Sequence, residues 1–205
     1  EGLPQLNFSF SKIMRFPDIW HNLTYLAGFF KIIPALIIIT AVSTEYTHRT
    51  ARQNIVDGMS RNEFVAGKLY LILLLTVLSS VLVFATGMVI GGINSGPGEL
   101  ARAAEELIYL VAYIIEFFTY LCYALLLAIL VRRPVVALIL LLVVDIVLEP
   151  FIGLLLGAPF RSYLPFKAVD DLIRFPLLDM MGDTRGEGVP WQRMVLALAY
   201  SIVAV

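Results

Sequence analysis

Long apolar runs, separated by short polar segments, dominate the chain from residue 22 to its end. A hydrocarbon core of about 30 Å needs roughly 20 apolar residues in a helix, and four of the runs are that long. They occupy residues 22–42, 65–93, 107–131 and 134–158. A fifth run, 191–205, ends before it can cross. We therefore predict an all-α fold, a polytopic transmembrane helix bundle with four full spans and one truncated span.

Composition excludes an ordinary soluble domain. Hydrophobic residues make up 60% of the 205 residues and charged residues 15%, with a mean hydropathy of +0.87. Soluble domains are nearer to about 45–50% apolar and about 25% charged. The net charge of −1 predicts no nucleic-acid partner, and the long apolar runs predict membrane lipids as the surroundings. The single cysteine, Cys122, and two widely separated histidines predict no disulfide, no metal site and no cofactor.

The distribution of charge between the runs predicts the orientation. Basic residues are retained on the cytoplasmic side of short loops, and they gather in residues 44–64 and at the Arg132-Arg133-Pro134 turn. Residues 94–106 and 159–190 carry more acidic than basic residues and are expected to be extracytoplasmic, like the N-terminal segment. The first span then runs inward. We expect one single domain, 1–205, in a multi-pass cell membrane protein, with six spans in the intact chain.

The polar segment 44–64 has helical periodicity. Ala51, Ile55 and Met59 recur at every fourth position, which predicts a short amphipathic helix that Gly58 can terminate. Ser60-Arg61-Asn62-Glu63 has the pattern of a capping box and predicts the start of the next helix. Two interpretations stay open: a helix lying on the membrane surface within a solvated loop, or a helix that docks into a separate cytoplasmic protein.

The stretch from Glu45 to Lys68 resembles the segment after the second transmembrane helix of ABC-2 type permeases. That family has a Glu, a Thr, an Arg and an amphipathic turn, then Ser-Arg, an acidic residue and Gly-Lys. The matching positions are Glu45, Thr47 or Thr50, Arg49 or Arg52, Ser60-Arg61, Glu63 and Gly67-Lys68. One departure is Gly58-Met59, where many members have Pro before the Ser-Arg pair.

The resemblance implies a bacterial inner-membrane permease subunit of an ABC transporter, in which this segment is the coupling helix that enters a cleft of the ATPase subunit. It further implies two partners, an ABC ATPase subunit and a second permease copy or homologue, with export as the transport activity. No P-loop pattern occurs in the chain, so we expect no enzymatic activity of its own. The expected coupling residues are Glu45, Arg49, Arg52, Gln53, Asp57, Ser60 and Arg61.

Four charged residues lie deep within the apolar runs, at membrane depth: Lys31, Glu116, Asp145 and Glu149. Such groups are costly at membrane depth and are expected to have partners, and the depths allow a Lys31–Glu116 or a Lys31–Asp145 pair. Three interpretations stay open. The charges fix helix packing or a dimer interface, or they form a polar substrate path or couple protons, or Glu149-Pro150 marks a helix break that is exposed to water. The alternative function is an intramembrane enzyme or a secondary transporter using Glu116, Asp145 and Glu149.

Smaller features complete the sequence expectations. Pro34 is expected to kink the first span, and Gly87, Gly91 and Gly92 to allow close packing or a break in the second. Apolar and charged residues alternate over 169–175, which predicts a short outer helix lying at the membrane interface.

Overall fold

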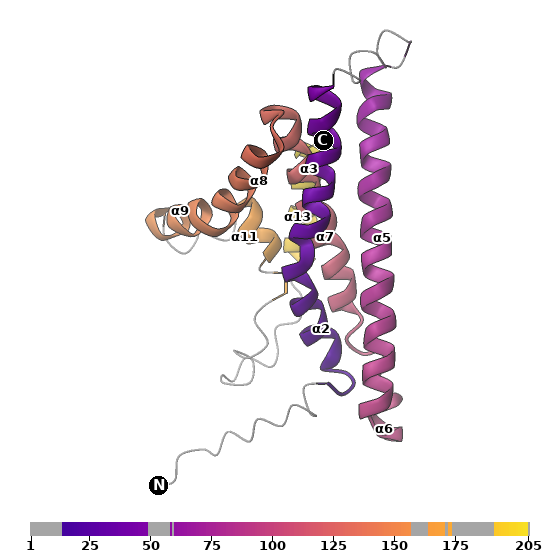
Figure 1. Ribbon diagram of the computed structural model, residues 1–205. Helices are drawn as coiled ribbons and strands as arrows, with labels where there is room; N and C mark the ends of the chain where they lie inside the picture. Colours follow the sequence, from indigo (N-terminus) through magenta and orange to yellow (C-terminus); the bar gives the residue numbers. More distant parts are fainter. Residues whose placement is uncertain are drawn as a thin grey trace.

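The computed structural model describes residues 14–48, 58, 60–156, 164–170, 172–173 and 191–204. These residues are almost entirely helical and contain no strand, which confirms the all-α prediction (Figure 1). Four helical segments are long and apolar enough to cross a membrane, so the chain is a multi-pass membrane protein. The four are Ile19–Thr47, Asn62–Asn94, Ile108–Val131 and Pro134–Leu155.

The first span consists of α2 (Ile19–Gly28), a turn of 3-10 helix η1 (Phe29–Lys31) and α3 (Ile32–Thr47). The irregular turn directly precedes the residues around Pro34, where the sequence predicts a kink. Proline lacks a backbone N–H and its ring displaces the carbonyl four residues earlier, which is that of Phe30. The predicted effect of Pro34 is therefore visible as the tightened turn η1.

The second and third spans are uninterrupted helices. α5 (Arg61–Asn94) is followed by the short α6 (Pro97–Leu100), and α7 (Ile108–Val131) follows a stretch of turns. Helix α7 packs against α3, α5, α8 and α13 and is the central helix of the bundle. Over half of its most apolar stretch is buried (56%), against 17% for α5, so α5 has the wider lipid-facing surface.

The fourth span is not one regular helix. α8 (Pro134–Val143) continues through five residues of π-helix, η2 (Val144–Leu148), into α9 (Glu149–Leu156). α8 packs against α7 and α3, whereas Figure 1 shows α9 leaning away from the other spans. π-helical turns in a helix are a known cause of bends.

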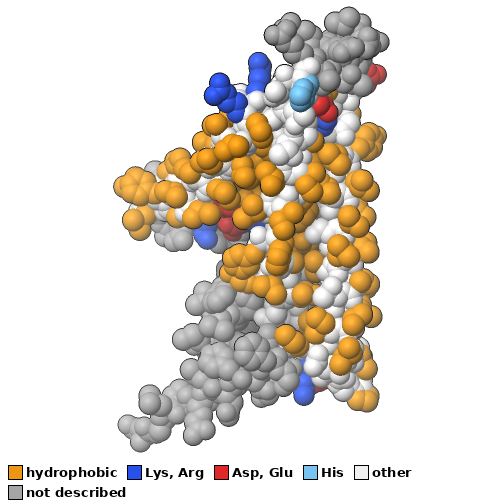
Figure 2. Space-filling view, viewed as in Figure 1, with side chains coloured by type: hydrophobic (Ala, Val, Ile, Leu, Met, Phe, Trp, Pro, Cys, Tyr) orange, Lys and Arg blue, Asp and Glu red, His pale blue; other side chains and the backbone are white. Residues whose placement is uncertain are grey.

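Two shorter helices complete the described residues. α11 (Pro165–Asp170) lies between α9 and the bundle and packs against α7 and α13 (Figure 1). α13 (Trp191–Ala204) packs against α7 and corresponds to the predicted truncated span. Large apolar side chains cover the sides of the long helices, and Lys and Arg side chains gather at the end where α8 begins (Figure 2). In water so large an exposed apolar surface would be a liability, whereas lipid accommodates it.

Candidate functional site

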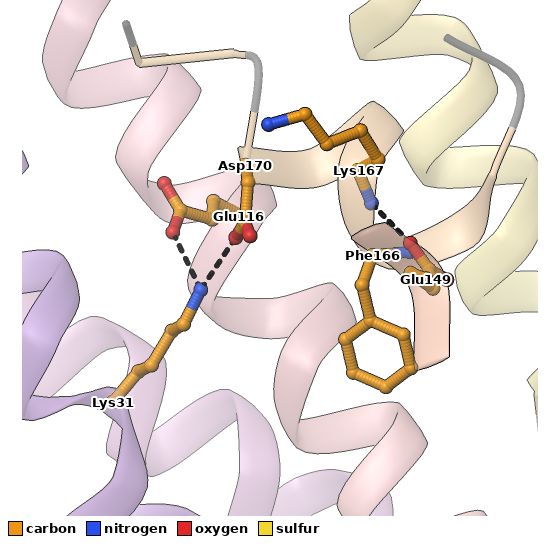
Figure 3. Close-up of polar contacts among 6 residues, drawn as sticks. All are labelled: Lys31, Glu116, Glu149, Phe166, Lys167 and Asp170. Carbon is orange, nitrogen blue, oxygen red and sulfur yellow. Dashed lines mark hydrogen bonds and ion pairs between the residues drawn. The ribbon is translucent and has the colours of Figure 1, made fainter. Parts of the chain in front are cut away.

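Three charged side chains from distant parts of the chain meet inside the bundle. Lys31 Nζ, at the end of η1, lies 3.1 Å from Glu116 Oε1 of α7 and 2.7 Å from Asp170 Oδ1 at the end of α11 (Figure 3). The Lys31 ammonium also lies 4.6 Å from the centroid of the Tyr120 ring, within the range of a cation–π contact. We call Lys31, Glu116 and Asp170 the charge cluster.

Burial differs between the two carboxylates of the charge cluster. The Lys31 and Glu116 side chains are 12% and 7% exposed, and that of Asp170 is 37% exposed. Removing one partner of a buried ion pair typically costs about 3–5 kcal/mol, because the other charge stays buried without compensation. An ion pair open to solvent contributes less. Separating Lys31 from Glu116 therefore costs more free energy than separating Lys31 from Asp170.

One of the two predicted pairs is present. The Lys31–Glu116 pair forms as expected, while the place expected for Asp145 is taken by Asp170. Asp145 lies half-buried in η2 and interacts electrostatically with Lys31, without an ion pair among the described residues. Asp170 belongs to the segment that hydropathy assigns to an outer loop, and its role could not be read from its own position in the sequence.

Glu149, the first residue of α9, holds the beginning of α11. Its carboxylate accepts the backbone N–H of Phe166 at 2.8 Å and that of Lys167 at 2.7 Å (Figure 3). Glu149 is only 4% exposed, so it does not mark a water-exposed helix break. The first N–H groups of a helix have no acceptor within the helix, and Glu149, from the neighbouring span, accepts two of those of α11 as a capping side chain does.

Aromatic and aliphatic contacts seat α11 against α7. The Phe166 ring packs on Tyr123 at 4.6 Å and meets Tyr120 edge-on at 6.0 Å. Val169, Leu172 and Ile173 are buried in the same core. The helix predicted over 169–175 is not found at that position: the described helix is Pro165–Asp170, Leu172 and Ile173 follow it outside any helix, and residues 171 and 174–175 lie outside the described residues. The described helix is packed into the bundle and does not lie at the membrane interface.

The ends of α3 and α5 meet at the end of the bundle predicted to be cytoplasmic. Glu45, in the last turn of α3, forms an ion pair with Lys68 in the second turn of α5. The Tyr46 and Phe64 rings contact edge-on at 6.4 Å, and the Arg132 guanidinium lies 5.3 Å from the centre of the Tyr46 ring. α3, α5 and the α7–α8 turn are thus joined at one end.

Local sequence chemistry explains both turns at this end. Ser60 Oγ accepts the Glu63 N–H at 3.2 Å, and the Glu63 carboxylate accepts the Ser60 N–H at 2.7 Å, which confirms the predicted capping box. Gly58 has a φ of +104°, the left-handed conformation expected for a helix terminator. Arg132 has a φ of 57°, and Pro134 starts α8 as predicted.

Most of the predicted coupling residues lie outside the described residues. These are Arg49, Arg52, Gln53 and Asp57. Of the others, Glu45 lies in α3, Ser60 caps α5, and Arg61 begins α5 with a side chain outside the description. Lys68, a matching position of the family resemblance, and Arg132, which sequence reasoning used to orient the chain, make specific contacts here.

The opposite end of the bundle joins the N-terminal residues to the 94–106 loop. The Trp20 indole N–H donates to the Ala103 carbonyl at 2.7 Å, and the Phe16 N–H donates to Ser95 Oγ at 2.9 Å. Burial, together with the neighbouring carboxylate of Asp18, raises the pKa of Glu106 above its ordinary value. The described part of the N-terminal segment and the 94–106 loop therefore lie at one end, as predicted, whereas most of the third segment, 159–190, lies outside the described residues.

Comparison of the chain with family models, curated proteins and solved structures gives no match. The function must be argued from the residues themselves. No group of three or more His, Cys, Asp or Glu side chains in the described part of the chain is arranged to hold a metal ion.

Proposed function

We propose that this chain is the membrane-spanning permease subunit of an ABC-2 type exporter in a bacterial cytoplasmic membrane. It pairs with a second permease copy or homologue, and ATP is hydrolysed by separate ATPase subunits. The observation that carries the proposal is the Glu45–Lys68 stretch, whose residues resemble the coupling segment of that family.

The geometry around this stretch supports the proposal. Its two ends are joined by the Glu45–Lys68 ion pair and by the Tyr46–Phe64 contact, which hold the ends of α3 and α5 together. Arg132, stacked on Tyr46, extends this junction to the α7–α8 turn. A displacement of this junction would therefore reach α3, α5 and the α7–α8 turn together, as coupling to a separate ATPase subunit requires.

The alternative function, an intramembrane enzyme or secondary transporter, has less support from the site. It needs Glu116, Asp145 and Glu149 to be available for chemistry or for cargo. Glu116 is paired with Lys31, and Glu149 is bonded to two backbone N–H groups of α11. Asp145 makes no ion pair among the described contacts, but it interacts with the Tyr120 hydroxyl and electrostatically with Lys31.

The test is a search of the neighbouring reading frames for an ABC ATPase with a P-loop, its co-purification with this chain, and measurement of ATP hydrolysis in the reconstituted complex. Replacing Arg49 and Arg52 by Glu is expected to reduce stimulation of hydrolysis about tenfold or more, because charge reversal at a docked interface is costly. Arg102→Glu, on the opposite end of the bundle, is the matched control and is expected to leave stimulation unchanged.

Two results would refute the proposal. One is purification of an active transporter with no ATPase bound. The other is normal transport after alanine replacement of Arg49, Arg52 and Arg61, combined with loss of transport after replacement of Glu116, which would favour the secondary transporter.

A further inference from the structure

Helix α9 has few attachments to the rest of the molecule. Among the described elements it packs mainly on η2, from which it continues, and on α11. Its large side chains Phe151, Leu154 and Leu155 are exposed. Figure 1 shows α9 leaning outward with α11 between it and the other spans. The position of α9 relative to the bundle is thus determined by η2 and by α11.

The two ends of α11 are held by different spans. Its first N–H groups are bound by Glu149 of α9, and its last residue, Asp170, is bound by Lys31 of η1 (Figure 3). The helix is only six residues long, so these contacts lie within two turns of each other. A force on α9 is transmitted through α11 to the first span.

Both contacts coincide with a backbone irregularity. Lys31 is the last residue of the 3-10 turn η1, and Glu149 directly follows the π-helical η2. A π-helical turn has a wider, less regular hydrogen-bond pattern than the α-helix and is a common bending point. η2 therefore has the properties of a hinge, next to the residue that α11 holds.

We propose that α11 is a latch that fixes the outward position of α9: α11 is seated on α7 and α13 and is pinned at its last residue by the Asp170–Lys31 pair, and separation of that pair loosens the seat so that α9 swings about η2. The geometry identifies Asp170 as the release point. Its carboxylate is the solvent-open member of the charge cluster, whereas Glu116 keeps Lys31 paired when Asp170 leaves. The Lys31 charge therefore remains paired with Glu116 in both states, so separation of Asp170 does not leave an uncompensated charge inside the bundle.

The proposal is independent of the transporter assignment and predicts a change in distance. Spin labels on Leu154→Cys in α9 and on Ile93→Cys at the end of α5 report the swing, because both positions are exposed. The buried Cys122 is replaced by Ala in every variant. A second label pair, Leu130→Cys with Ile93→Cys, reports the remainder of the bundle. The intact protein is measured in lipid nanodiscs by pulsed dipolar spectroscopy.

In Asp170→Asn the fraction of molecules with a changed Leu154–Ile93 distance is expected to rise about tenfold, as for the loss of one charge-assisted hydrogen bond. The Leu130–Ile93 distance is expected to stay as in the parent. Glu149→Gln, at the other end of the latch, is expected to act in the same direction. Glu105→Gln, which removes an exposed ion pair with Arg102, is the control and leaves both distances unchanged.

Three results would overturn the latch. The first is a Leu154–Ile93 distribution that Asp170→Asn leaves as in the parent. The second is a change in both label pairs, which would mean that Asp170 stabilises the whole bundle. The third is a response to Glu149→Gln without any response to Asp170→Asn, because α11 would then hold α9 without the first span.

Discussion

Two glycines of α5 lie directly beneath aromatic rings at the outer end of the bundle. A Cβ added at Gly87 would lie 2.6 Å from the Trp20 ring, and one added at Gly91 would lie 2.5 Å from the Phe16 ring. Carbon atoms in contact are about 3.5–4.0 Å apart, so each ring would have to retreat by about 1 Å. A Cβ at Gly92 would meet nothing within 4 Å.

The cost of Gly87→Ala follows from what holds Trp20. The indole is fully buried, donates to the Ala103 carbonyl at 2.7 Å and stacks on Phe84 at 5.5 Å. Overpacking costs about 1–3 kcal/mol, and a strained or lost hydrogen bond adds about 0.5–1.5 kcal/mol. Alanine returns about 0.8–1.0 kcal/mol of helix propensity. We expect a net loss of about 1–3 kcal/mol, and for Gly92→Ala a gain of about 0.5–1 kcal/mol.

The assay is unfolding in detergent followed by the emission of Trp20, in a Trp191→Phe background that leaves one tryptophan. The expected order of stability is Gly92→Ala, then the parent, then Gly87→Ala. The emission of Trp20 is also expected to shift in the folded state of Gly87→Ala, because its ring is displaced. Equal stability of Gly87→Ala and Gly92→Ala, with unchanged emission, would refute the close packing.

Three further predictions follow from single contacts. Glu149→Ala leaves two backbone N–H groups of α11 without an acceptor and is expected to reduce the free energy of unfolding by about 1–3 kcal/mol more than Glu149→Gln does, which a lower melting temperature would show. Equal melting temperatures of the two variants would contradict this. Ser60→Ala is expected to cost about 1 kcal/mol, with faster hydrogen exchange confined to the first turn of α5, and adding Glu63→Ala should cost little more because the two residues form one capping box. Burial and the nearby Asp18 carboxylate raise the pKa of Glu106 from 4.5, so the stability that its protonated form contributes is present below pH 4.5 and is lost as the pH rises through the raised value. Glu106→Gln should therefore flatten the decline of the melting temperature with pH. An unchanged profile would contradict this.

Features with local causes were predictable from the sequence. Hydropathy alone locates the spans, because a lipid core imposes length and apolar character on every crossing helix. The Ser60–Glu63 box and the Pro134 start depend on neighbouring residues and are confirmed. Gly58 has the positive φ that glycine favours, while the helix it was expected to end lies outside the described residues. The Lys31–Glu116 pair was predictable because a buried charge needs a partner at its own depth.

Features that depend on how a polar segment folds back were not predictable. Hydropathy assigns 159–190 to an outer loop, and nothing near Asp170 in the sequence connects it to Lys31 across the 139 residues that separate them. The π-helical η2 likewise interrupts an apolar run that contains only two charged residues, Asp145 and Glu149. One clue was present: a carboxylate such as Glu149, embedded in an apolar run, requires donors, and the bound N–H groups of α11 supply them.

The membrane-buried charges and the helix irregularities have a common explanation. A helix in lipid satisfies its own backbone, so a break is tolerated only where protein groups compensate for it. Lys31 closes η1 and Asp145 lies within η2, while Glu149 stands at the junction of η2 and α9. These three charges are therefore tied to irregular places in the spans, while Glu116, in the regular helix α7, is the partner of Lys31. Charges used in this way are poorly suited to act as separate catalytic or transport sites. This supports the proposal that the polar segment beyond Glu45 is the part that couples the chain to a separate ATPase subunit.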